Sequence, residues 1–253
     1  MKQEFNTTKR LFLSACVSVL ALIGFAQGSS HFYFDLGLKG GYGLNLLVNK
    51  NILNDKHVFS EFSFAPTFGA RLGGNFNERH SINIEVLSSS FKQDYTIRTD
   101  SLAWNKTIAF KTLDVALLYK KFVEGTYIEV GPEVAFMSKA SETNSVTGNR
   151  DITKEVVPTY FAGVFGFGAN FLGNDNFCVM AGVRATYSFT DILSDGAGKS
   201  NVYSLNDNFY KSGYTSYKTT NPLTIRLMIE VSFDMGYFAR SNCKKKRTKF
   251  LGF

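Results

Sequence analysis

Apolar and polar residues alternate with a period of two along most of the chain. The clearest example is the segment 223–235, in which every odd position is apolar and every even position except Met228 is polar. Because side chains of a β-strand point alternately to its two faces, this pattern predicts strands with one apolar and one polar face. Beyond residue 26 the sequence shows neither sustained helical periodicity nor an apolar stretch long enough for a membrane helix.

The alternation predicts eight strands with a regular order of connections. We expect them near residues 32–44, 60–73, 81–92, 106–120, 127–138, 157–171, 177–190 and 222–238. Loops of about a dozen or more residues are expected after the first, third, fifth and seventh strands, and short turns after the second, fourth and sixth. An up-and-down antiparallel barrel with all its long loops at one end produces this order.

Two kinds of eight-stranded barrel fit the alternation, and the charges distinguish them. A soluble lipocalin-type barrel buries its apolar face, whereas an outer-membrane barrel turns that face to lipid. Here the polar faces carry both signs at mid-strand, and such charges can neutralise one another in a narrow interior. We therefore predict an all-β fold, an eight-stranded antiparallel up-and-down transmembrane barrel with short periplasmic turns and long extracellular loops. A soluble sandwich with solvated charged faces is the alternative.

Side chains fill the interior of an eight-stranded barrel, so we expect no open pore. The predicted interior polar network comprises Lys39, Arg71, Glu85, Asp114, Glu129, Glu133, Arg184, Arg226, Glu230 and Asp234. We expect Arg184 and Arg226 at its centre, because a planar guanidinium can bind two carboxylates, with Glu133, Asp114 and Glu230 as partners. Aromatic residues near the strand ends are expected to form membrane-interface girdles: Phe62, Phe68, Tyr119, Phe136, Phe161, Phe171, Phe177, Tyr187, Phe189 and Tyr237.

The first residues have the features of a secretory signal peptide. Lys2, Lys9 and Arg10 precede an apolar run that ends in Gly24-Phe25-Ala26. We expect residues 1–26 to be removed by cleavage after Ala26. An uncleaved membrane anchor is one alternative, and a lipoprotein signal at Leu13-Ser14-Ala15-Cys16 is a second, although the apolar run continues well beyond Cys16. Residues 27–239 then form the barrel, with both mature ends in the periplasm.

Most of the positive charge lies at the two ends of the chain. The signal carries a net charge of +2 and the tail from 240 to 253 carries +6, while the whole chain carries +7, which leaves −1 for the barrel. The composition therefore gives no support to nucleic-acid binding. The basic tail residues are Arg240, Lys244, Lys245, Lys246, Arg247 and Lys249.

Several segments, taken in order, resemble one protein family. Leu36-Gly37-Leu38-Lys39-Gly40-Gly41 is similar to the first-strand motif of the outer-membrane β-barrel family of Bacteroidetes, which includes the PorT-like proteins. Further similarity lies in 112–120, where Ala116 replaces the usual proline, and in 127–132, 163–168 and 184–192. The resemblance implies an outer-membrane location and an eight-stranded barrel. Some PorT-like members are linked to the type IX secretion machinery.

Catalytic chemistry has little support in the sequence. None of His31, His57 and His80 lies on a strand beside an evident nucleophile or carboxylate, and the three Cys lack zinc-site spacing. We predict no enzymatic activity, no cofactor and no metal. An outer-membrane lipid hydrolase, with His57 near Glu61, is a distant alternative.

The loops and the tail are better candidates for function. The 191–221 loop is rich in Asn, Ser, Tyr and Gly, a composition suited to adaptable contacts. The basic tail suits anionic lipid, cell-wall polymer or an acidic protein partner. The alternatives to these binding roles are that the loop is only solvated and that the tail only increases solubility. We expect a structural or interaction protein of the outer membrane, whose partners are membrane lipid and an envelope or periplasmic protein. A barrel subunit of a secretion or envelope assembly is the second candidate.

Overall fold

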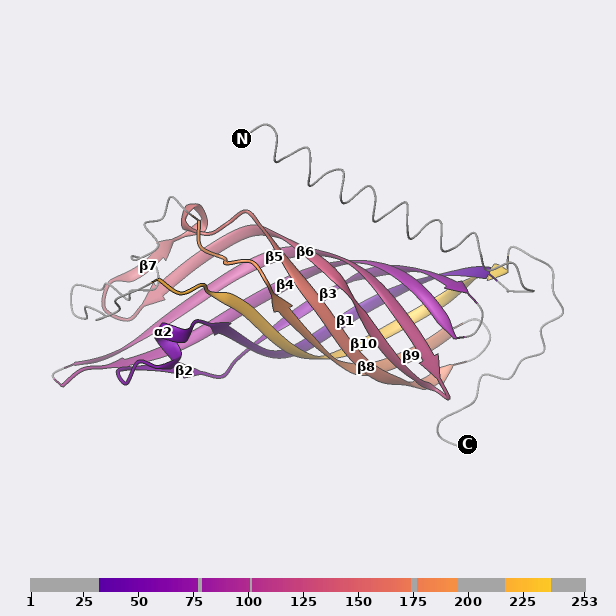
Figure 1. The fold of residues 1–253 in the computed structure, drawn as a ribbon, viewed down its shortest axis with the longest axis horizontal. Coiled ribbons are helices and arrows are strands. Elements are labelled where there is room, and N and C mark those ends of the chain that lie inside the picture. The colour runs from indigo at the N-terminus through magenta and orange to yellow at the C-terminus, as the bar shows by residue number, and fades with distance from the viewer. Residues whose placement is uncertain (1–31, 77–78, 101, 174–176, 195–216, 238–253) are drawn as a thin grey trace.

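Eight long antiparallel strands form one closed sheet. The computed structural model describes residues 32–76, 79–100, 102–173, 177–194 and 217–237 (Figure 1). The eight strands are β1 (Phe32–Val48), β3 (Ser63–Phe76), β4 (His80–Arg98), β5 (Ala103–Val123), β6 (Thr126–Asn144), β8 (Thr159–Gly173), β9 (Phe177–Ser188) and β10 (Asn221–Tyr237). Each pairs with its neighbours in chain order, and β1 pairs with β10, which closes the ring. The predicted fold class is confirmed.

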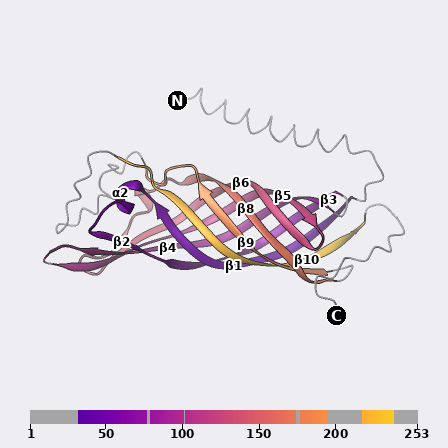
Figure 2. The same cartoon turned by 60° about the horizontal axis from the view of Figure 1, so that its bottom comes forward.

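The two ends of the barrel differ. At one end, called here the short-turn end, β5 and β6 are joined by Glu124 and Gly125, whose φ angles of 47° and 83° suit a tight hairpin turn. The other end, the long-loop end, holds the small elements α2 (Lys50–Leu53), β2 (Val58–Glu61), β7 (Gly148–Asp151) and η1 (Thr153–Glu155). Figure 1 labels α2, β2 and β7 there, and Figure 2 shows α2 and β2 from another side. In the described part of the chain, no helix is long and apolar enough to cross a membrane.

The prediction of a long loop after the third strand is wrong. β4 and β5 remain paired from His80 and Lys121 as far as Arg98 and Ala103, so only four residues separate the two paired strands. The expectation failed because outward residues such as Lys92 are polar there, and the apolar alternation therefore stops. The strands continue because their inward side chains, Tyr95 among them, are buried.

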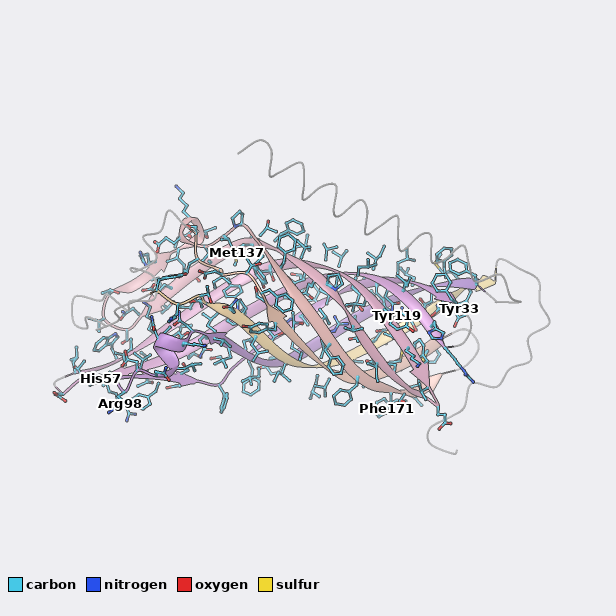
Figure 3. The ribbon with its side chains drawn as sticks, in the orientation of Figure 1. Tyr33, His57, Arg98, Tyr119, Met137 and Phe171 are labelled. Atoms are coloured by element: carbon cyan, nitrogen blue, oxygen red, sulfur yellow. The ribbon has the colours of Figure 1, made fainter. Side chains whose placement is uncertain are left out.

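The outer surface of the barrel is apolar over a continuous belt. Outward side chains such as Leu38, Phe68 and Leu227 are each about two-thirds exposed, whereas inward Lys39 and Glu230 are almost fully buried. Figure 3 shows side chains, including Tyr119 and Phe171, standing off the outside of the barrel. A soluble lipocalin-type barrel has the opposite arrangement. Among the predicted girdle residues, Phe62, Phe68, Tyr119, Phe136, Phe161, Phe171, Tyr187 and Phe189 are exposed. Phe177 is half-buried, and the side chain of Tyr237 lies outside the described residues.

The interior is charged over only part of its length. Toward the long-loop end, inward residues form an apolar core in which the Phe91 and Phe110 rings stack 4.3 Å apart. Ile52 of α2 and Val58 of β2 also belong to this core. The physical reason is a change of solvent: past the apolar belt the outer face is polar, so the inner face can be apolar as in a soluble protein.

The inward face of the barrel is tightly packed around Gly69. A Cβ added there would overlap the Val86 carbonyl oxygen, whereas the nearest atom to a Cβ on outward Gly40 is the Thr67 carbonyl oxygen at 3.8 Å. We expect Gly69→Ala to lower the free energy of unfolding by about 1–3 kcal/mol, because overpacking forces the strands apart. Gly40→Ala is the matched control and should change it by less than about 0.5 kcal/mol. Urea unfolding in lipid vesicles measures both, and equal midpoints would contradict the tight packing.

Candidate functional site in the barrel interior

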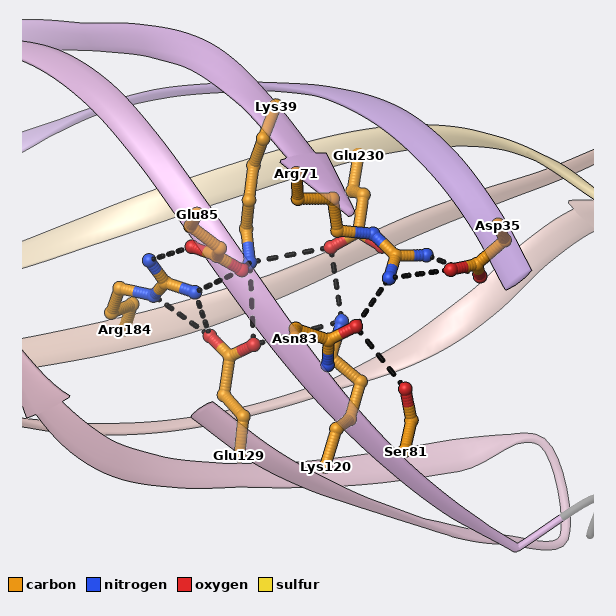
Figure 4. A network of polar contacts seen from close by, with 10 residues as sticks. All are labelled: Asp35, Lys39, Arg71, Ser81, Asn83, Glu85, Lys120, Glu129, Arg184 and Glu230. Atoms are coloured by element: carbon orange, nitrogen blue, oxygen red, sulfur yellow. Dashed lines mark hydrogen bonds and ion pairs between the residues drawn. The ribbon is translucent and has the colours of Figure 1, made fainter. Parts of the chain in front are cut away.

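Four basic and four acidic side chains meet inside the barrel (Figure 4). The cations are Lys39, Arg71, Lys120 and Arg184, and the anions are Asp35, Glu85, Glu129 and Glu230. We call these eight residues the central network. They come from every long strand except β8, because inward positions recur at every second residue of each strand.

Lys39 of β1 joins three of the four acidic groups. Its Nζ lies 2.8 Å from Glu85 Oε1, 3.2 Å from Glu129 Oε2 and 3.2 Å from Glu230 Oε2. An ammonium group has three donors, so this geometry gives each N–H a carboxylate. The strands β4, β6 and β10 are therefore tied together through one side chain of β1.

Arg184 of β9 binds two carboxylates through the sides of its guanidinium. Nη1 lies 2.7 Å from Glu85 Oε2, Nη2 lies 2.6 Å from Glu129 Oε1, and Nε donates to that same Glu129 oxygen at 2.7 Å. Gly166 of β8 provides the space, because a Cβ there would lie 2.7 Å from Glu129 Oε1. Arg184 thus binds two carboxylates, as the sequence suggested, but they are Glu85 and Glu129 and not the expected Glu133, Asp114 or Glu230.

Arg71 and Lys120 complete the network toward the short-turn end. Arg71 Nη2 lies 2.7 Å from Asp35 Oδ2, and its Nε lies 2.5 Å from Glu230 Oε1. Lys120 Nζ lies 3.0 Å from Glu230 Oε2 and 4.5 Å from the centre of the Tyr127 ring, a cation–π contact. Every cation of the central network therefore has an anionic partner.

The central network is neutral and nearly dry. Its four positive and four negative formal charges cancel, and no side chain in it is more than 7% exposed. Buried ions are tolerated when they are paired and hydrogen-bonded, as these are. Chemically the arrangement links seven strands through paired, buried charges.

Arg226, Asp114 and Glu133 form a separate polar group on the long-loop side of the central network. They line a small cavity with Tyr160, and the cavity has room for roughly one water molecule. Arg226 lies opposite Arg184 in the β9–β10 register, but it donates to the Ser90 carbonyl oxygen at 3.2 Å. The structure therefore places Arg226 outside the central network. Of the three partners that the sequence suggested, Asp114 and Glu133 line the same cavity as Arg226, whereas Glu230 belongs to the central network.

Sequence reasoning missed two members of the central network, Asp35 and Lys120. Both occupy inward positions, so the alternation could have identified them. They lie near strand ends, however, where the sequence is equally compatible with a side chain at the rim of the barrel. The side chain of Asp234 lies outside the described residues, as do all six predicted tail residues, Arg240, Lys244, Lys245, Lys246, Arg247 and Lys249.

The histidines that the structure describes lie at the two ends of the barrel. Nδ1 of His57 is 2.9 Å from the Arg98 carbonyl oxygen, and Nδ1 of His80 is 2.5 Å from the Tyr119 hydroxyl. Glu61 accepts a hydrogen bond from Thr96. Within residues 32–237, gaps excepted, no cluster of three or more His, Cys, Asp and Glu side chains is placed to hold a metal ion.

Known structures similar to this chain are outer-membrane and surface proteins. OprG from Pseudomonas aeruginosa has a TM-score of 0.37 and 12% identity, covering 81% of this chain and 97% of its own. Neisserial surface protein A has a TM-score of 0.34 and 9% identity, covering 78% and 96%. The outer-membrane protease OmpT from Escherichia coli has a TM-score of 0.36 and 8% identity, covering 83% and 99%. Neither the comparison with family models nor that with curated proteins finds a match.

The closed antiparallel ring and its apolar outer belt are those of an outer-membrane β-barrel protein. A sheet can lie in lipid only if it has no open edge, and the pairing of β1 with β10 removes that edge. The likeness to solved structures concerns the fold alone. Membership of the Bacteroidetes family, and of its PorT-like branch, stays a prediction.

Arg184 is the residue whose loss tests the network most directly. Arg184→Met leaves Glu85 and Glu129 without their main partner, so we expect the free energy of unfolding to fall by about 3–5 kcal/mol. Lys92→Met is the control, because Lys92 pairs with Asp94 at a surface position where ion pairs contribute less than about 1 kcal/mol. Urea titrations in vesicles compare the two. A similar small loss in both variants would show that the buried pairs contribute little.

Proposed function

We propose that this protein is a closed outer-membrane barrel that acts as a structural or interaction protein through a sheet projecting beyond the membrane. One observation carries this: β4, β5 and β6 continue as ordered strands well past the apolar belt. β4 has 19 residues, whereas a tilted strand crosses a bilayer in about 9–11. β2 pairs with the far part of β4 and β7 with that of β6, so five strands form this projecting sheet.

Ion pairs and hydrogen bonds hold the projecting sheet in one conformation. Lys106 Nζ lies 3.1 Å from Glu142 Oε1, and Arg150 links Glu142 to Glu155 at 3.1 and 2.8 Å. Glu142 faces inward because a bulge at Ser138 shifts the β5–β6 register. An ordered surface of this kind supports binding, because fewer side chains must lose conformational freedom when a partner is bound.

Polar contacts also fix the outer face of the projecting sheet. Partial burial raises the pKa of Asp94, but hydrogen bonds from Lys92, Thr107 and Ser63 outweigh it and lower that pKa below its ordinary value. Asp94 therefore remains charged near neutral pH. Arg98 lies 5.5 Å from the centre of the Phe59 ring, across the β2–β4 edge. This face offers both charges and aromatic surface to a partner.

We place the long-loop end outside the cell and both mature termini in the periplasm. The support is the usual arrangement of outer-membrane barrels, in which short turns face the periplasm and longer segments face outward. The basic tail would then meet anionic lipid or an acidic envelope partner in the periplasm. A subunit of a secretion or envelope assembly is the second candidate, and the family resemblance in the sequence is its support.

The closed interior predicts that the purified barrel does not conduct ions. Planar-bilayer recordings should show no steady conductance, because the central network and the apolar core both obstruct the axis. The matched control is a barrel of similar size with a known open channel, inserted under the same conditions. Steady single-channel steps from the purified protein would contradict the proposal of a plugged, non-conducting barrel.

The orientation predicts which end a membrane-impermeant maleimide can reach. In a chain whose native cysteines are serine, Asp100→Cys in the β4–β5 turn should be labelled on intact cells. Glu124→Cys, in the turn at the other end, should be labelled only after the outer membrane is opened. The reverse pattern would place the projecting sheet in the periplasm and overturn the orientation.

A further inference from the structure

Two exposed lysines face each other where β5 and β6 leave the apolar belt. Lys111 and Lys139 are direct partners in the β5–β6 register, and both are on the outer surface. Like charges directly opposite each other destabilise a sheet. Neither ammonium group makes an ion pair within the described residues, in contrast to nearby Lys92, which pairs with Asp94 at 2.8 Å.

The position of this lysine pair matches the level of lipid headgroups. The next pair of outward residues toward the short-turn end is Leu113 and Phe136. Both are exposed and belong to the apolar belt. The next pair of outward residues toward the long-loop end is Ala109 and Ser141, and the polar face of the projecting sheet begins there. Charged side chains at such a boundary can neutralise headgroup phosphates.

The β-bulge shapes the surface around the two lysines. Ser138 is the extra residue, and its hydroxyl donates to the Lys111 carbonyl oxygen at 2.9 Å. Ser138 and Lys139 are therefore both exposed on the outer face. Asp151, the acidic residue near Lys139, accepts a hydrogen bond from the Thr153 backbone N–H at 2.8 Å. Lys154 follows Thr153 and is exposed, and both Lys139 and Lys154 attract the Asp151 carboxylate.

We propose that Lys111 and Lys139 bind the phosphate of an anionic lipid headgroup, with the acyl chains lying over Leu113 and Phe136. A phosphate between the two ammonium groups would remove their mutual repulsion, and the apolar belt directly below would hold the chains. The placement in the outer leaflet rests on the proposed orientation. The phosphorylated glycolipids of that leaflet are therefore the occupants to which the proposal commits.

Binding can be measured on the purified barrel in zwitterionic detergent micelles. The probe is lipid A carrying two phosphates, compared with its monophosphoryl and fully dephosphorylated forms. We expect Lys111→Gln/Lys139→Gln to weaken binding of the doubly phosphorylated form by about tenfold or more, with little change for the dephosphorylated form. Lys50→Gln is the matched control. Lys50 is an exposed lysine of α2 at the same end, next to β1, which lies four strands from β6 in either direction around the ring.

Stability gives a second readout that does not depend on the binding assay. In lipid-free micelles Lys111→Gln should raise the unfolding temperature, because it removes the repulsion, and with lipid A present it should reduce the stabilisation seen for the unaltered chain. Equal lipid affinity of the double variant, or no change in either stability measurement, would overturn the proposal. Inorganic phosphate that competes fully with lipid A would show an anion site and not a lipid site. Conductance and cysteine labelling test the proposed function separately.

Discussion

Closing eight strands into a barrel leaves an interior in which every buried charge must find its partner inside the ring. The central network meets this constraint with equal numbers of cations and anions drawn from seven strands. Because Lys39 and Arg184 each bind carboxylates from several strands, the network also fixes the register of the sheet. A slip of one residue in any of these strands would turn a charge toward lipid, where its desolvation is not compensated.

The same strands meet two solvents along their length, and their side-chain polarity inverts accordingly. On β4 the inward residue Glu85 lies between outward Ile84 and Val86, whereas farther along the inward residue Phe91 lies between Ser90 and Lys92. On β4 the alternation does not change phase. The environment of the outer face changes from lipid to water along the strand. In each part of the strand, apolar side chains occupy the face that is shielded from water.

Because the charges of the central network pair with one another, the groups that we propose for binding lie on the outer surface. The projecting sheet gives it an ordered polar face held by Glu142 and Arg150. The boundary between that face and the apolar belt carries the opposed pair Lys111 and Lys139. These two features share one cause, because the Ser138 bulge turns Glu142 inward and leaves Lys139 outward. One extra residue thus connects the packing of the projecting sheet with the charge at the membrane rim.

Alternation in the sequence predicted the strands, because the period of two is a local property of the backbone, and the mid-strand charges predicted which face points inward. It also placed Lys39, Glu85 and Arg184 inside, since their neighbours are apolar. Which charges meet was decided only by the tertiary structure: Arg226 and Arg184 are direct partners in the register, yet they bind different groups. The length of β4 and β5, the apolar core and the inward turn of Glu142 were also beyond the sequence. Each depends on strand register, on a bulge or on where the strand leaves the bilayer. Register and bulges are set by contacts between residues far apart in the chain.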